Sequence, residues 1–84
     1  MKSHSLASFW QCYDALPEHV QRLAKKKFGL LKTNPKDPSL GFQKKGGIYT
    51  VDIGRSYCAI ARERNGEYYW CWIGTHEEYD CFRF

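Results

Sequence analysis

The apolar residues of this chain change their spacing near residue 40, and this change constrains the fold more than any other feature. Before it, they recur every three or four residues, as they do on one face of a helix. After it, they alternate or run together in short segments that end at glycine-containing turns, as they do in strands. Helices followed by strands predict an α+β protein rather than an alternating α/β one.

Two helices are expected in the first part. The apolar stripe of the first helix is Leu6, Phe9, Trp10, Tyr13 and Leu16, and one face of the second is traced by Val20, Leu23, Ala24, Lys27, Phe28 and Leu31. Ser5 or Ser8 is placed to cap the first helix. Pro17 fits the first turn of the second helix, because its missing N–H has no partner to lose there. The second helix must end by Asn34, because Pro35 disfavours a helical conformation at the residue before it.

Three or four antiparallel strands are expected in the second part. The segments are Leu40 to Lys45, Ile48 to Ile53, Tyr57 to Arg62 and Glu67 to Ile73. Asn65-Gly66 is the strongest hairpin signal among the turns between them. In the last segment Tyr68, Trp70 and Trp72 alternate with Tyr69, Cys71 and Ile73. One of these two sets is expected in the core, and the other could form a platform on which bases stack.

The expected fold class is therefore α+β, with an N-terminal helical hairpin packed on one face of a three- to four-stranded antiparallel sheet. The opposite face is expected to be open, concave and available to a partner. The length of 84 residues has room for one core, so residues 1–84 are expected to form a single domain. Aromatic residues make up 17% of the chain, which favours a packed core over disorder.

The net charge of +4 is unevenly distributed. Eight basic residues lie between positions 22 and 45: Arg22, Lys25, Lys26, Lys27, Lys32, Lys36, Lys44 and Lys45. Only Asp37 opposes them, and such a cluster predicts a phosphate-binding surface. The alternative is a solvated helix face that keeps the domain soluble.

Several classes of site and location are not expected. No segment approaches the ~18 consecutive apolar residues of a membrane span, and the first ten residues lack the apolar run of a signal peptide. We therefore expect a cytoplasmic protein with no membrane partner. The four cysteines lack the spacing of a zinc site, so free thiols and no metal are expected. Neither a nucleotide loop nor a Ser/His/Asp arrangement is present, and no small-molecule cofactor is expected.

The candidate catalytic residues lie around the end of the last strand. His76 could transfer a proton near neutral pH, Tyr79 could lie beside it in a helical turn, and Arg55 could hold a phosphate through two hydrogen bonds. RNA cleavage needs little beyond a base, an acid and a cation, and it needs no metal. The candidate RNA-binding residues are Lys25, Lys26, Lys44, Lys45 and Arg62. The alternatives are that His76 only caps the following turn and that Tyr79 is a core anchor.

The chain also resembles a subgroup of the RelE/ParE toxin superfamily. The opening segment carries FWxxYxxLPxxVQ from Phe9 to Gln21, followed by Asn34-Pro35, Pro38-Ser39-Leu40 and Phe42-Gln43-Lys44. The closing segment, Trp70 to Asp80, is the more specific match, with the sequence WCWIGTHEEYD. The resemblance covers about residues 8 to 82.

This resemblance implies the RelE-like fold and a cognate antitoxin as partner. For the RelE-like branch it implies a metal-independent endoribonuclease that cuts mRNA on the ribosome and so inhibits translation. In that branch, cationic residues on the sheet act with a His, Arg or Tyr near the C-terminus. His76 falls on the last of these positions, and Tyr79 lies close by.

The sequence departs from the subgroup at two positions in the middle strands. Asp52 stands where arginine is common, and Cys58 stands where arginine is nearly the rule. Two alternatives therefore accompany the nuclease prediction. One is a ParE-like toxin that binds DNA gyrase and needs no catalytic residues. The other is a catalytically degenerate, non-toxic relative.

Overall fold

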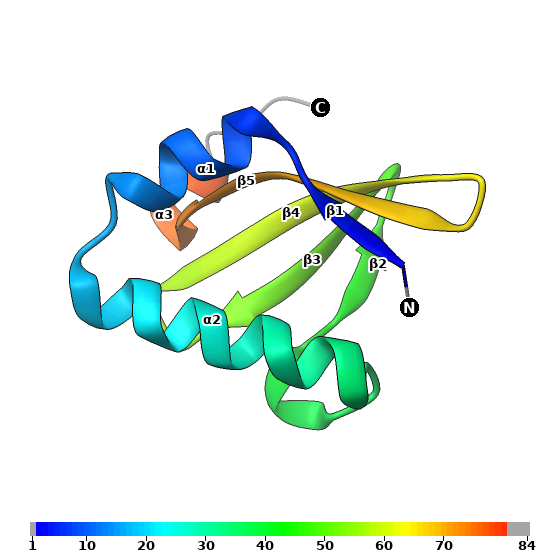
Figure 1. The fold of residues 1–84 in the computed structure, drawn as a ribbon, viewed down its shortest axis with the longest axis horizontal. Helices are drawn as coiled ribbons and strands as arrows, with labels where there is room; N and C mark the ends of the chain where they lie inside the picture. Colours follow the sequence, from blue (N-terminus) through cyan, green and yellow to red (C-terminus); the bar gives the residue numbers. More distant parts are fainter. Residues whose placement is uncertain (1, 81–84) are drawn as a thin grey trace.

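The computed structural model describes residues 2–80, which form five strands and three α-helices. In chain order the elements are β1 (Ser3–Ser5), α1 (Ala7–Asp14), α2 (Glu18–Thr33), a 3-10 turn (Pro38–Leu40), β2 (Gln43–Lys45), β3 (Ile48–Ile53), β4 (Tyr57–Arg64), β5 (Glu67–Thr75) and α3 (His76–Asp80). The strands form one sheet in the order β1-β5-β4-β3-β2 (Figure 1). The α+β class is confirmed.

The sheet is mixed rather than purely antiparallel, and it does not begin after the helices. Strand β1 precedes α1 and pairs in parallel with β5, whereas the other neighbouring strands are antiparallel. Strand β1 was not predicted, because Ser3-His4-Ser5 has no apolar alternation. Contacts with β5 fix its place instead: the His4 Nε2 atom lies 2.8 Å from the Glu67 carboxylate, and the His4 ring stacks on Tyr69.

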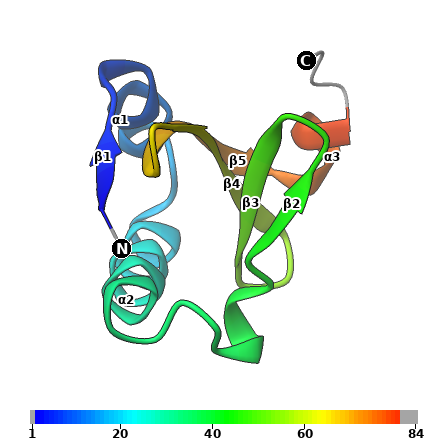
Figure 2. The ribbon, with the colours of Figure 1, turned by 90° about the vertical axis from the view of Figure 1, so that its right-hand side faces the viewer.

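Helices α1 and α2 cover the same face of the sheet and run in opposite directions, as predicted (Figures 1 and 2). Helix α2 ends at Thr33, also as predicted. The N-cap of α1 is Leu6, which has no side-chain cap, so neither Ser5 nor Ser8 caps this helix. The Ser8 hydroxyl instead donates a 2.8 Å hydrogen bond to the Cys71 carbonyl oxygen and ties α1 to β5.

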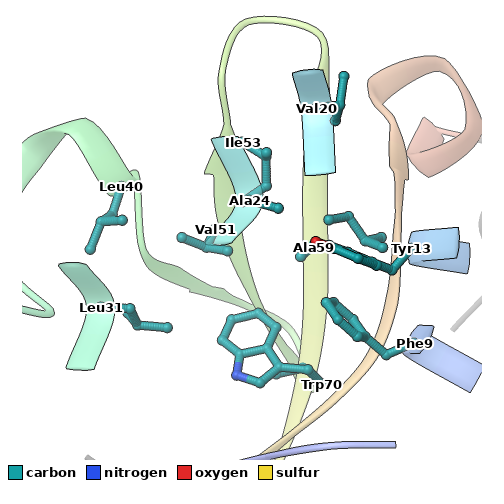
Figure 3. Close-up of a cluster of buried hydrophobic side chains, with 12 residues drawn as sticks. Phe9, Tyr13, Val20, Ala24, Leu31, Leu40, Val51, Ile53, Ala59 and Trp70 are labelled. Carbon is teal, nitrogen blue, oxygen red and sulfur yellow. The ribbon is translucent and has the colours of Figure 1, made fainter. Parts of the chain in front are cut away.

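The main core lies between these helices and the sheet (Figure 3). Phe9 and Tyr13 reach it from α1, and Ala24 and Leu31 reach it from α2. The register of β4 and β5 shifts between Ile60 and Ala61, so that Ile60 is opposite Trp72 and Ala61 is opposite Trp70. Cys71 is the extra residue in β5.

This bulge overturns the expected alternation of β5. Both Trp70 and Ile73 belong to the core cluster, although they come from the two sets of residues that were expected on opposite faces. A bulge places two residues of one strand opposite one of its neighbour, and it therefore changes which positions face the core. A simple alternating pattern cannot reveal this change.

The face of the sheet that is turned away from α1 and α2, here called the outer face, is not open as expected. Ile48, Thr50, Cys58 and Ile60 alternate with core residues along β3 and β4, yet each is at most 4% exposed. Helix α3 lies on this side, beyond the sheet from α1 and α2 (Figure 2). The central strands carry apolar residues at successive positions, a pattern typical of a sheet covered on both faces.

None of the helices within residues 2–80 is both long enough and apolar enough to cross a membrane.

Candidate functional site

The short helix α3 begins with a reciprocal capping arrangement. The Thr75 hydroxyl accepts a 3.1 Å hydrogen bond from the Glu78 backbone N–H. The Glu78 carboxylate in turn accepts 3.0 Å hydrogen bonds from both the backbone N–H and the hydroxyl of Thr75. This is a capping box, which stabilises the first turn of a helix. Thr75 therefore caps the helix, and His76 is its first residue.

A backbone hydrogen bond connects the start of α3 to the turn between β3 and β4. The His76 N–H donates to the Ser56 carbonyl oxygen over 2.9 Å. Since Arg55 precedes Ser56 in that turn, this bond brings the two predicted catalytic residues to the same end of the sheet.

His76 and Arg55 line one shallow pocket of about 300 Å³, together with Ser56, Thr75 and Glu77. Arg55 is exposed and His76 is partly exposed, so both side chains are accessible to a ligand. An imidazole can donate or accept a proton near neutral pH, and a guanidinium can bind a phosphate. The pocket thus holds the two kinds of group that metal-independent phosphoryl transfer requires, alongside one carboxylate.

Tyr79 has different neighbours from Arg55. The Lys45 Nζ atom lies 5.5 Å from the centroid of the Tyr79 ring, a cation–π contact between β2 and α3. Tyr79 does not line the pocket of His76 and Arg55. The structure therefore divides the predicted catalytic set into a His76–Arg55 pair and a Tyr79–Lys45 pair, which α3 connects.

A row of three residues crosses the outer face, one residue in from the end of the sheet that carries Arg55 and His76. Asp52 is opposite Cys58, and Cys58 is opposite Gly74. Burial raises the pKa of the Cys58 thiol to about 11, and the Asp52 carboxylate raises it further. Lys45 acts in the other direction and lowers it. This row therefore presents a neutral thiol and a carboxylate where the resembling subgroup has arginines.

The remaining predicted RNA-binding residues are spread over the molecule. The Lys44 Nζ atom lies 5.9 Å from the centroid of the Tyr49 ring. Lys25 lines a groove beside α1 and β1, Lys26 is exposed on α2, and Arg62 borders a separate surface pocket. None of these four residues lines the pocket of His76 and Arg55.

Two residues that build the site were given no role in the prediction from sequence. Thr75 and Glu78 match the Thr-x-x-Glu pattern of a capping box, which was available in the sequence as a signal for α3. As for metals, no group of three or more His, Cys, Asp or Glu side chains within residues 2–80 could hold an ion.

Comparisons with known proteins identify the fold. No family model matches the sequence, and no curated protein matches it significantly. Solved structures do match, and three of them, at TM-scores of 0.64 to 0.71, have the fold of RelE-type toxins.

Three of them illustrate the likeness. YafQ from E. coli strain BL21(DE3) has a TM-score of 0.71 and 12% identity over 93% of this chain and 96% of its own. A copper-bound mutant toxin from Helicobacter pylori has a TM-score of 0.64 and 20% identity, over 93% and 97%. RelE of the RelB-RelE antitoxin-toxin complex from Methanococcus jannaschii has a TM-score of 0.67 and 16% identity, over 94% and 98%.

Proposed function

We propose that this chain, which has the RelE fold, is the toxin of a toxin–antitoxin pair and cleaves mRNA on the ribosome in the cytoplasm. The observation that carries the proposal is the shared pocket of His76 and Arg55. The fold supports the toxin role, since the three structural neighbours described above are RelE-fold toxins. The RelB-RelE complex supports an antitoxin as partner.

The proposed reaction transfers a phosphoryl group within the RNA. The 2′-hydroxyl attacks the adjacent phosphorus, the bond from phosphorus to the 5′ oxygen breaks, and a proton moves from the 2′ oxygen to the 5′ oxygen. His76 carries that proton as general base and acid. Arg55 stabilises the additional negative charge on the phosphorane oxygens. The products are a 2′,3′-cyclic phosphate and a 5′-hydroxyl end.

In this proposal the second pair, Lys45 and Tyr79, contacts the RNA beside the pocket. The Lys45 ammonium contributes a cation close to the outer face, where Asp52 and Cys58 contribute none. Lys44 and Arg62 act farther along the strands as point charges for the RNA backbone. These contacts bind the polyanion without taking part in proton transfer.

Controlled expression in bacteria without antitoxin tests the proposal. Wild-type protein should stop growth, whereas His76→Ala and Arg55→Ala should each relieve the arrest. Lys36→Ala removes an exposed charge outside the pocket and is the control, which should arrest growth like wild type. Unchanged arrest in both pocket variants would contradict the assignment of the site.

The row of Asp52 and Cys58 favours a second candidate, a relative that binds partners but no longer cleaves RNA. A carboxylate repels the phosphates of RNA, and a neutral thiol cannot bind them as a cation would. This candidate predicts normal growth when the wild-type chain is expressed alone. A toxin that acts on DNA gyrase would instead stop growth with DNA damage and intact mRNA. Transcripts and DNA analysed after the same induction therefore separate all three functions.

A further inference from the structure

A pocket lies beside the tight turn of the β4–β5 hairpin and is here called the hairpin pocket. Its lining residues are Leu6, Arg62, Glu63, Arg64 and Tyr69. Its volume is about 620 Å³, within the roughly 300–1,000 Å³ typical of ligand sites. Figure 1 shows the hairpin and α3 at opposite ends of β5. Tyr69 and Thr75 are six residues apart on β5, about 20 Å at the rise of a strand, so this pocket is separate from that of His76 and Arg55.

The ring of Tyr69 has a fixed orientation in the hairpin pocket. Its centroid lies 4.9 Å from that of the His4 ring, and the two rings are stacked at an interplanar angle of 23°. The His4 Nε2 atom lies 2.8 Å from the Glu67 carboxylate, which holds the stacked imidazole in turn. A ring that is fixed before binding loses little conformational freedom when a flat ligand stacks on it. The part of the Tyr69 ring that His4 leaves uncovered is therefore a prepared surface for stacking.

The hairpin pocket opens on the outer side of the sheet. Ser3 and Ser5 line a groove on the side of α1 and α2, so His4, which lies between them in β1, points to the other side. Tyr69 is the register partner of His4 and points the same way. Leu6 is 41% exposed and adds aliphatic surface. The pocket thus combines aromatic and aliphatic surface on the side of the sheet that is proposed to bind RNA.

Two arginines of the hairpin pocket are free to bind an anion. Arg62 and Arg64 are exposed, and neither forms an ion pair within residues 2–80. Glu67 is opposite Arg64 in the hairpin, but its carboxylate pairs with His4 instead. Arg62 is opposite Tyr69, which places a guanidinium group beside the aromatic ring. Because guanidinium groups bind phosphate through two hydrogen bonds, the pocket suits a ligand that carries phosphate.

The Glu63 carboxylate also lines the hairpin pocket, and it restricts the ligand further. Glu63 is exposed and forms no ion pair in the described part of the chain. A carboxylate repels a bare phosphate, but it accepts hydrogen bonds from the amino groups of bases and from hydroxyl groups. A ligand that satisfies every group in the pocket therefore has a flat ring, a phosphate and hydrogen-bond donors. A nucleotide has all three.

We infer that the hairpin pocket binds one unpaired nucleotide of a single-stranded RNA, at a distance from the site of cleavage. The base stacks on the part of the Tyr69 ring that His4 leaves uncovered, and Leu6 contacts the edge of the base. The neighbouring phosphates pair with Arg62 and Arg64. Aromatic rings and cations in this combination bind single strands with little preference for sequence. The chemistry by itself fits a nucleotide, and the identification of that nucleotide as part of an RNA rests on the proposed function.

Titration of a 12-nucleotide single-stranded RNA tests the stacking, in a parent protein that carries His76→Ala so that the RNA stays intact. Tyr69→Ala should weaken binding at least fivefold, because stacking on an aromatic side chain contributes at least that much per base. Tyr69→Phe keeps the ring and should bind within twofold of the parent. Trp10→Ala removes an exposed ring outside the hairpin pocket and should not change the affinity. Equal affinities of Tyr69→Ala and Tyr69→Phe would overturn the inference.

A change in the RNA repeats this test without changing the fold. A 12-residue oligomer that lacks bases keeps the phosphates and removes stacking, so the parent should bind it at least fivefold more weakly than the complete RNA. In Tyr69→Ala this preference for bases should be at least threefold smaller. The same preference in both proteins would contradict stacking on Tyr69, and tighter binding of DNA than of RNA with the same sequence would exclude RNA as the ligand.

The arginines have a matched control on α2. Arg64→Gln should weaken binding at least threefold and should reduce the slope of log K against log salt by about 0.7, the value for one phosphate contact with a single strand. Arg22→Gln makes the same change of charge at an exposed position outside the hairpin pocket and should affect both quantities much less. Equal effects of the two variants would show only a general charge effect and contradict the inference.

The length of the RNA tests whether the two pockets hold one strand. At ~3.4 Å per stacked nucleotide, about six nucleotides span the distance between them. The affinity of the parent should rise at least tenfold from a 4-nucleotide to a 10-nucleotide RNA, and the rise should be at least threefold smaller in Tyr69→Ala. Equal rises would contradict the inference. If the wild-type chain cleaves no RNA in cells, the proposed function fails, while these titrations still decide whether the hairpin pocket binds a nucleotide.

Discussion

The backbone N–H of His76 donates a 2.9 Å hydrogen bond to the carbonyl oxygen of Ser56. The position of His76 beside Arg55 is therefore set by main-chain atoms and does not depend on the imidazole. Removal of the imidazole should leave α3 in place, and His76→Ala should change chemistry much more than stability. This makes His76 a favourable position for separating the site from the fold.

The capping box should control the order of α3. We expect Thr75→Val to destabilise the protein by about 1 kcal/mol, because it removes the acceptor for the Glu78 N–H. Thr75→Ser keeps a hydroxyl, and its loss of stability should be only a small part of the loss in Thr75→Val. Thermal unfolding measures both variants. A Thr75→Val protein as stable as Thr75→Ser would show that the hydroxyl does not hold α3.

Two glycines with similar backbones should differ in their tolerance of alanine. Gly46 and Gly54 have φ values of 61° and 69°, where a Cβ atom costs about 1–2 kcal/mol. At Gly46 the Cβ would meet nothing within 4 Å, but at Gly54 it would lie 2.8 Å from Leu23 Cδ2. Gly54→Ala should therefore lower the free energy of unfolding by about 1 kcal/mol more than Gly46→Ala. Urea denaturation tests this, and equal losses would exclude the contact with Leu23 as a cause.

Cys58 should be the least reactive of the described thiols. The residue is 2% exposed, and its pKa is raised from 9.0 to about 11, which lowers the thiolate fraction near pH 8 about 100-fold. Alkylation followed by peptide mass spectrometry should label Cys58 in the unfolded chain but hardly in the native one. Labelling of native Cys58 as fast as in urea would contradict its burial.

The same shift predicts a loss of stability at alkaline pH. The native state favours the neutral thiol, so the unfolded chain ionises first as the pH rises. The contribution of Cys58 is complete below pH 9 and is lost as the pH rises from 9 towards 11. A Cys58→Ser variant should lack this part of the pH dependence. Chemical denaturation of both proteins at pH 8 and pH 10.5 measures the difference.

Asp52 should oppose RNA binding. At ~10 Å and an effective dielectric of about 20, one carboxylate repels a phosphate charge by roughly 1.7 kcal/mol before screening by salt. Asp52→Asn keeps the shape and removes the charge, so we expect RNA affinity to rise up to about tenfold at low salt and less at high salt. Fluorescence titration with a short single-stranded RNA measures this. An unchanged affinity at low salt would place the RNA away from the outer face.

Much of the fold could be predicted from the sequence, because local signals determine it. Asn65-Gly66 forms the predicted tight turn, with both residues at positive φ, and Pro35 correctly limits α2. Strand β1 was missed because contacts distant in sequence hold it, among them His4 with Glu67. The bulge at Cys71 was missed because a single extra residue leaves no pattern in the sequence. Apolar residues such as Ile48 and Ile60 indicate that the outer face is covered. Because they alternate with Val51 and Ala59, however, the sheet was expected to be covered on one face only.

The candidate site could be predicted from the sequence only in part. The sequence places His76 at a strand end and Arg55 in a turn, and their proximity depends on how β4 and β5 pair, which brings Tyr57 opposite Thr75. The position of Tyr79 depends on the path of α3 across the outer face towards Lys45. The path of α3 depends on tertiary contacts, and the spacing of residues in the sequence does not indicate it.

The central claim is that His76 and Arg55 cleave RNA, and mapping of transcript 5′ ends soon after induction tests it most directly. Wild-type protein should create new 5′-hydroxyl ends within the coding regions of translated mRNAs, and His76→Ala should create none while remaining folded. Growth arrest with intact transcripts, or the same new ends in the His76→Ala strain, would contradict the claim.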